Sequence, residues 1–132
     1  MTRGGPRSPD PFATWLGLRW DDARTTRLTI RPELLNSGGL LLGPVGFALV
    51  DYSMGSTLWE TTSEDEHIAT TSISLNYVQS ASAGDVTCRS QLDRRNRTTG
   101  HLRSELRTAD RLLATAIGSF AIFPAATLDR RS

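Results

Sequence analysis

The sequence contains no lysine, a single cysteine and only two histidines among its 132 residues. Without lysine, the chain has no residue for Schiff-base chemistry and none for the phosphate-binding lysine of a P-loop. The lone Cys88 excludes a disulfide framework within the chain. Together with His67 and His101 it offers too few ligands for a zinc site. We therefore expect neither a metal nor a cofactor.

An excess of charge of one sign is also lacking, because acidic and basic residues leave a formal net charge of +1. This balance gives no indication of a nucleic-acid partner or of a membrane surface. No uncharged apolar stretch reaches the length that spans a bilayer. Residues 1–11 contain no apolar run of the kind found in a secretory signal. These absences lead us to expect a cytoplasmic protein.

The chain has the length of one ordinary domain. Residues 1–10 and 125–132 are rich in Gly, Pro, Arg, Ser and Asp, so we expect flexible tails there and a folded domain over residues 11–124. Phe12 to Leu16 predicts a short helix, because Asp10 suits the N-cap and proline suits the first helical position.

One long helix is predicted over residues 44–59, with Gly43 as its N-cap. It is apolar on nearly every face, which is typical of a buried helix. The glycine-rich residues 34–43 before it predict a shaped loop. Alternation of apolar and polar residues predicts strands at residues 18–21, 26–30, 85–94, 102–109 and 112–123. A content rich in Thr, Ile and Tyr predicts another strand at residues 68–78. A single long helix within a run of antiparallel strands predicts an α+β domain whose curved sheet wraps around the helix.

Asp51 is the strongest candidate for chemistry, because it is the only charged residue between Gly43 and Glu60. Aspartate is a poor residue for a helix interior, and a buried carboxylate without a partner is costly. The alternative is that Asp51 lies on an exposed stripe of the helix or caps a neighbouring loop. Glycines immediately before the helix indicate free N–H groups that can hold an oxyanion, although glycine there is often only a turn.

Three further features need an interpretation, and two of them have both a functional and a structural one. Asn36 can contact a carbonyl group or a water molecule, or can simply form a turn. Cys88 lies in an alternating strand, where a core-packing thiol is the favoured interpretation. A turn rich in arginine can bind phosphates or can be a solvated loop; its residues are Arg94, Arg95 and Arg97.

The segment from Asn36 to Pro44, followed by Ala48-Leu49-Val50-Asp51, resembles the signature of PaaI-like hotdog-fold acyl-CoA thioesterases. That signature reads roughly N-x-x-G-x-x-H-G-G and then L-x-D on a helix. The stretches 76–85 and 112–120 resemble two later motifs of the same family, so the resemblance covers about residues 12–123. It implies a single hotdog domain that works as a homodimer, assembled into a dimer of dimers or homotetramer, with active sites at the dimer interface.

By this resemblance, Asp51 is the nucleophile or general base, and Gly43 supplies the oxyanion-hole N–H. Asn36 orients the thioester carbonyl or the water, and Thr70 supports the attack. The Asn–Gly pair and the acid come from different subunits in relatives. The arginine turn falls where relatives contact the phosphates of coenzyme A, which is part of the substrate. The implied reaction is hydrolysis of an acyl-CoA or acyl-carrier-protein thioester.

The chain departs from the signature at two positions. Leu42 replaces the usual histidine, and Pro44, which has no N–H, replaces the second glycine. These departures favour an alternative in which the domain binds an acyl ligand or only dimerises. A hotdog lyase or dehydratase is a further alternative. It ranks last, because such enzymes generally pair a histidine with an acid and neither histidine is expected near the Asp51 helix.

Overall fold

The computed structural model describes residues 9–129 of the chain. Within that range, six strands and four helical segments follow one another along the chain. In order, they are α1 (Pro11–Leu16), β1 (Arg19–Asp22), β2 (Thr25–Thr29), the 3₁₀-helix η1 (Pro32–Leu34), α2 (Gly43–Trp59), β3 (Glu66–Tyr77), β4 (Asp85–Arg95), β5 (Thr99–Arg107), β6 (Leu112–Pro124) and α3 (Ala126–Asp129).

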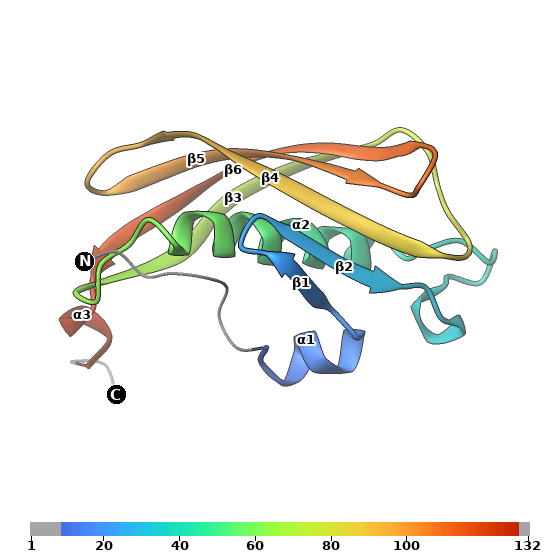
Figure 1. Cartoon of the computed structure of the whole chain (residues 1–132), viewed down its shortest axis with the longest axis horizontal. Coiled ribbons are helices and arrows are strands. Elements are labelled where there is room, and N and C mark those ends of the chain that lie inside the picture. The colour runs from blue at the N-terminus through green and yellow to red at the C-terminus, as the bar shows by residue number, and fades with distance from the viewer. Residues whose placement is uncertain (1–8, 130–132) are drawn as a thin grey trace.

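The six strands form one antiparallel sheet in the order β1-β2-β4-β5-β6-β3. The sheet curves around α2, with β3 to β6 arching over one side of the helix and β1 and β2 crossing another (Figure 1). This arrangement confirms the predicted α+β class and the sheet wrapped around one long helix. Both ends of the sheet are edges, and β3 is by far the longer of the two edge strands.

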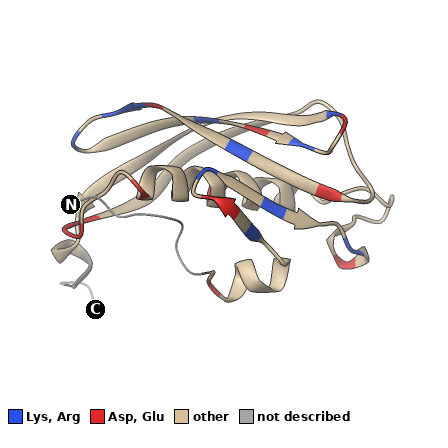
Figure 2. Cartoon of the chain, in the orientation of Figure 1, with Lys and Arg blue, Asp and Glu red and all other residues tan. Residues whose placement is uncertain are grey.

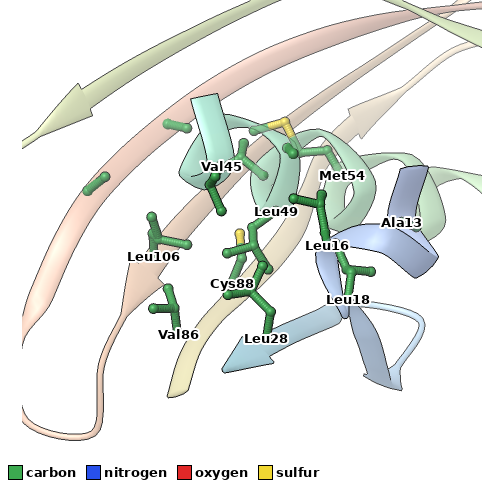
Figure 3. Close-up of a cluster of buried hydrophobic side chains, with 14 of the residues drawn as sticks. Ala13, Leu16, Leu18, Leu28, Val45, Leu49, Met54, Val86, Cys88 and Leu106 are labelled. Atoms are coloured by element: carbon green, nitrogen blue, oxygen red, sulfur yellow. The ribbon is translucent and has the colours of Figure 1, made fainter. Parts of the chain in front are cut away.

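The hydrophobic core lies between α2 and the inner face of the sheet. Val45 and Leu49 of α2 point toward apolar side chains of β2, β4 and β5 (Figure 3), whereas Met54 packs beside Gly118 of β6. Strand β5 alternates as predicted, since every second residue from Gly100 to Leu106 is buried and those between are exposed. Cys88 is fully buried in this core, so its expected packing role is confirmed.

Helix α1 begins and ends where its local signals predict. The Asp10 side chain accepts a hydrogen bond of 2.8 Å from the Ala13 N–H, and Pro11 follows at the first helical position. Gly17 ends the helix at a φ of 77°, in the left-handed region that favours glycine. Helix α2 differs from its prediction by one residue, because Leu42 is the N-cap and Gly43 is the first helical residue.

The prediction that α2 is buried on every side is wrong for this chain. Ten of its residues are buried, but one stripe along the helix is exposed or half-buried. The stripe repeats every three or four residues, which is one face of a helix, and consists of Pro44, Phe47, Asp51, Gly55 and Trp59. Composition alone conceals this face because all but one of its residues are uncharged.

Hydroxyl groups tie the buried side of α2 to the sheet. Ser53 Oγ donates to the Arg24 carbonyl at 2.8 Å and lies 2.7 Å from Ser90 Oγ, which in turn lies 2.6 Å from Ser104 Oγ. Ser56 donates to the carbonyl of Ala23. These bonds satisfy polar groups that would otherwise be destabilising in an apolar core. No pattern in the sequence predicts this network.

The expected domain spans residues 11–124, and the described elements from α1 to β6 fill that range. Residues 1–8 and 130–132 of the expected tails lie outside the described residues. Helix α3 occupies a segment for which the sequence predicted a tail. Among the described residues, no helix is long and apolar enough to cross a membrane.

Candidate active site

Asp51 lies near the middle of α2, on the exposed stripe, and its carboxylate faces β3. The Thr70 hydroxyl of β3 donates a hydrogen bond of 2.7 Å to Asp51 Oδ1. Within residues 9–129, Asp51 Oδ2 has no hydrogen bond and remains available to accept one from water. The structure therefore brings together two of the predicted site residues. It also shows Asp51 half-buried and partnered, not enclosed in the core as the apolar helix suggested.

A cavity of about 200 Å³ opens beside this carboxylate, and we call it the acid pocket. A cavity of about 150 Å³ can hold a benzene molecule, so the acid pocket has room for a group of about that size. Its walls combine apolar side chains with two carboxylates and contain no arginine; they are formed by Asp10, Trp20, Asp51, Tyr52, Gly55, Ser56, Ile68, Ala69, Thr70 and Phe120.

Tyr52 links the acid pocket to the N-terminal end of α1. Its hydroxyl donates to the Asp10 carboxylate, with O–O distances of 2.8 and 2.9 Å, and its ring packs edge-on against Trp20. Burial, followed by the hydrogen bond and negative charge of Asp10 and the charge of Asp51, raises the pKa of Tyr52 to about 12. The Ala13 N–H and then the Tyr52 hydroxyl lower the pKa of Asp10. At neutral pH the pocket therefore carries a neutral phenol and an ionised Asp10.

The glycine-rich loop before α2 is shaped by Asn36. Its Oδ1 accepts hydrogen bonds from the N–H groups of Gly38 (2.9 Å) and Leu40 (3.0 Å), and Gly39 adopts a φ of 81°. Asn36 is therefore a turn former, as one interpretation of the sequence held. Its side-chain Nδ2 has no hydrogen bond among the described residues, so the same residue can still donate to a ligand.

Gly43 lies where α2 begins, and its N–H has no acceptor in the described part of the chain. The neighbouring N–H groups are not free, because Leu42 donates to Leu34 and Val45 donates to Leu42. Pro44 has none. The first turn therefore offers a single free donor, at the position that the resemblance predicts for an oxyanion.

A second pocket, of about 400 Å³, opens at this end of α2, and we call it the donor pocket. Asn36 and Gly43 both line it, so the structure brings these two predicted residues together. The remaining lining is neutral and includes Leu40, Leu41, Tyr77, Val78, Gln79, Ser80, Ala81 and Leu113.

Asp51 and Gly43 do not meet within one chain. They are eight residues apart on the same helix, which corresponds to about 12 Å along the axis, and they line different pockets. Each chain therefore carries the two halves of the predicted site at separate positions.

The predicted phosphate-binding turn lies at the opposite end of α2 from Gly43, at the hairpin between β4 and β5 (Figures 1 and 2). Arg95 is already engaged there, through an ion pair of 2.8 Å with Glu66 and a hydrogen bond of 2.7 Å to the Thr61 carbonyl. Arg94 and Arg97 are exposed. The three arginines are thus not equivalent, since one of them stabilises the fold.

The expectation that both histidines lie away from the long helix is wrong for His67. Its ring packs against Trp59, the last residue of α2, with centroids 5.8 Å apart, and against Phe123 at 6.3 Å. Trp59 is eight residues, or about 12 Å along the helix, beyond Asp51. Within residues 9–129, no group of three or more His, Cys, Asp or Glu side chains is arranged to hold a metal ion.

Sequence reasoning missed three residues that shape these pockets, namely Asp10, Trp20 and Tyr77. Trp20 and Tyr77 are aromatic residues on predicted strands, where the core is the ordinary interpretation. Asp10 was recognised only as a helix cap. Nothing local to the sequence signals that its carboxylate also reaches a tyrosine 42 residues away.

Comparison with known proteins finds the same fold in solved structures. Among solved structures, a conserved protein of Pseudomonas aeruginosa is 26% identical, with a TM-score of 0.80 over 87% of this chain and 95% of that one. A phenylacetic acid degradation-related protein of Ralstonia eutropha, provisionally named a thioesterase, is 25% identical, with a TM-score of 0.77 over 86% and 92%. A Bacillus halodurans protein crystallised with CoA shares 18% identity and a TM-score of 0.83 over 89% and 78%.

No curated protein is similar enough in sequence to count as a match. The sequence nevertheless matches the family model described as the thioesterase superfamily over residues 38–115, which include Gly43, Asp51 and Thr70. That range covers more than half of the chain and runs from the loop before α2 into β6. The predicted hotdog fold is confirmed, and the chain belongs to the thioesterase superfamily.

Proposed function

We propose that the protein hydrolyses an acyl-CoA or acyl-carrier-protein thioester to a free acid and a thiol. The observation that carries the proposal is the Asp51–Thr70 hydrogen bond in an open pocket of a thioesterase-superfamily domain. A thioester is already activated toward attack, so one carboxylate and one or two oriented donors suffice. The reaction needs no metal and no cofactor beyond the coenzyme A of the substrate.

Asp51 acts in this proposal as the general base or as the nucleophile. With Oδ1 held by Thr70, Oδ2 accepts the proton of a water molecule, and the resulting hydroxide attacks the thioester carbonyl carbon. The Gly43 N–H and Asn36 Nδ2 stabilise the oxyanion. The C–S bond then breaks, and the proton held by Asp51 passes to the leaving thiolate. In the nucleophilic route, the Asp51 carboxylate attacks the carbon itself, and water hydrolyses the anhydride that forms.

A complete site in this proposal needs two copies of the chain, because Asp51 and Gly43 line separate pockets of one copy. The donor pocket of one subunit then meets the acid pocket of its partner. Two features support pairing at this place: β3 is the long edge strand of the sheet, and the uncovered stripe of α2 lies beside the Asp51–Thr70 contact. We propose a homodimer, with two dimers forming a tetramer.

The charges of the acid pocket and of the arginine turn indicate which end of the substrate lies at each. The acid pocket carries two carboxylates and no arginine, so phosphates are repelled there and the acyl group is the better occupant. The CoA phosphates are assigned to the exposed Arg94 and Arg97, with Arg95 contributing less because it pairs with Glu66. The ammonium of a lysine is a point charge, whereas the planar guanidinium of an arginine suits bidentate contacts to phosphate.

The test is thiol release from a panel of acyl-CoA and acyl-carrier-protein thioesters, comparing wild type with Asp51→Asn. We expect kcat to fall by at least about 10²-fold, as for loss of a residue needed only in the transition state. The matched control is Asp65→Asn, which removes an exposed carboxylate outside both pockets.

Equal turnover in wild type and Asp51→Asn would contradict the proposal. Absence of turnover across the panel, with retained binding of CoA thioethers, would favour a second candidate, a non-catalytic acyl-binding domain. The missing N–H at Pro44 is the observation that favours this candidate, because it leaves only one backbone donor in the first turn.

A further inference from the structure

Tyr77, the last residue of β3, lies across the first turn of α2. Its hydroxyl donates to the Gly43 carbonyl at 2.5 Å. The ring is so close to the helix that a Cβ on Gly46 would lie 2.1 Å from the Tyr77 oxygen, whereas a Cβ on Gly43 would lie 3.8 Å from Cε2. The absence of a side chain at Gly46 is therefore what allows Tyr77 to reach the Gly43 carbonyl.

The backbone of α2 already restrains the peptide that carries the Gly43 N–H, because the Leu42 carbonyl accepts from the N–H groups of Val45 and Gly46. Side chains add little else there, since Leu42 makes no side-chain capping bond and Pro44 contributes no N–H. Glycine explores backbone conformations that other residues avoid, so a contact on the other peptide of Gly43 further narrows the direction of its N–H. The Tyr77 hydroxyl is the side-chain donor that fixes the carbonyl of this same residue.

We propose that Tyr77 is a positioning residue that aligns the single free N–H of the first turn, that of Gly43, with the developing oxyanion. The inference rests on the proposed function, because it assigns a role within that site. Donors that point at an oxyanion are effective only when they are preorganised, so a loosely held Gly43 N–H is a weaker catalyst. The phenol is protonated and able to donate at physiological pH, and burial raises the pKa of Tyr77 further, to about 12.

The test compares Tyr77→Phe, which keeps the ring and removes the hydroxyl, with a matched control. Thr26→Val is suitable, since the Thr26 hydroxyl of β2 also donates to an α2 carbonyl, that of Leu49, at 3.0 Å and outside both pockets. We expect Tyr77→Phe to lower kcat by about tenfold with KM within about twofold, less than the 10²–10³-fold effect of removing an oxyanion donor outright. Thr26→Val is expected to lower Tm and leave kcat unchanged.

The NMR order parameter of the Gly43 N–H supplies a readout that needs no turnover. We expect a lower order parameter in Tyr77→Phe and no change in Thr26→Val. Unchanged kcat in Tyr77→Phe, or equal losses of kcat in both variants, would overturn the role of Tyr77 while leaving the thioesterase proposal intact. A wild-type protein without turnover would instead overturn the proposed function. An unchanged order parameter in Tyr77→Phe would overturn the Tyr77 contact as a restraint.

Discussion

The two pockets beside α2 differ in how they are built. The donor pocket is neutral and depends on backbone geometry, through a glycine N–H and a loop folded around Asn36. The acid pocket depends on side chains, with Asp51 and Asp10 held by hydroxyl groups of Thr70 and Tyr52. One helix thus presents a donor at its N-terminus and a carboxylate two turns later. A reaction that needs both must bring the donor pocket of one copy to the acid pocket of another.

The largest expected effect comes from mixing two inactive variants, which tests whether the two pockets combine across subunits. Asn36→Asp keeps the Oδ1 acceptor that shapes the loop but loses the amide donor, and Asp51→Asn loses the acid. Each variant alone is expected to be inactive. A symmetric dimer has two equivalent sites, and equal mixing makes half of the dimers mixed. Each mixed dimer contains one intact site out of two. We therefore expect about a quarter of wild-type activity. Co-refolded mixtures assayed for thiol release measure this recovery.

The control for this experiment is a mixture of Asp51→Asn with Asp51→Ala, whose lesions lie in the same pocket and whose mixed dimers contain no intact site. It is expected to stay inactive. If the Asn36→Asp and Asp51→Asn mixture also stays inactive although mass spectrometry detects mixed dimers, the two pockets do not combine across subunits. Activity of either variant alone would show that its pocket is dispensable.

The second prediction concerns the acid pocket alone. Thr70→Val removes the hydroxyl that donates to Asp51 at 2.7 Å. A hydrogen bond to a charged group contributes about 1.5–3 kcal/mol, so we expect kcat to fall by about tenfold or more. Thr70→Ser, which retains the hydroxyl, is expected to stay near wild type. Thr71→Val is the control, because the adjacent Thr71 hydroxyl donates to the Ser119 carbonyl and not to Asp51. Similar rates in Thr70→Val and Thr71→Val would exclude a role for this bond.

The elements that follow local rules were predictable from the sequence. Asp10 and Pro11 locate the start of α1, and Gly17 locates its end, because each acts on backbone groups within four residues. The strands follow from alternation, and Asp51 stands out because its helix is otherwise uncharged. The family resemblance supplied Thr70, which has no local signal of its own.

Contacts between distant segments were not predictable, because they depend on how β3 and α1 lie against α2. The Tyr77–Gly43 and Tyr52–Asp10 bonds join residues 34 and 42 positions apart, and no local pattern fixes either distance. The sequence left the exposed stripe of α2 as an alternative, for a related reason. Apolar residues that face solvent in one chain have the same composition as those in its core, so hydrophobicity alone cannot separate the two.

The smallest predicted effect is a difference in how salt changes the pKa of the tyrosine in each pocket. Burial raises the pKa of both Tyr52 and Tyr77 to about 12, but nearby carboxylates contribute only at Tyr52. Salt screens interactions between charges and has little effect on burial. We therefore expect high salt to lower the pKa of Tyr52 and leave that of Tyr77 unchanged, as measured by NMR titration of the two ring signals. Equal responses would show that the acid pocket exerts no distinct field on its tyrosine.

The same shifts set the stability of the fold in alkali. Because the folded state favours the neutral phenols, their contribution to the free energy of unfolding is complete below pH 10, the ordinary pKa, and is lost as the pH rises to about 12. Denaturant unfolding across this range measures the loss. Tyr52→Phe and Tyr77→Phe should each flatten the decline, and the salt dependence should disappear only with Tyr52→Phe. A decline that neither variant alters would assign alkaline unfolding to other groups and remove the electrostatic distinction between the two pockets.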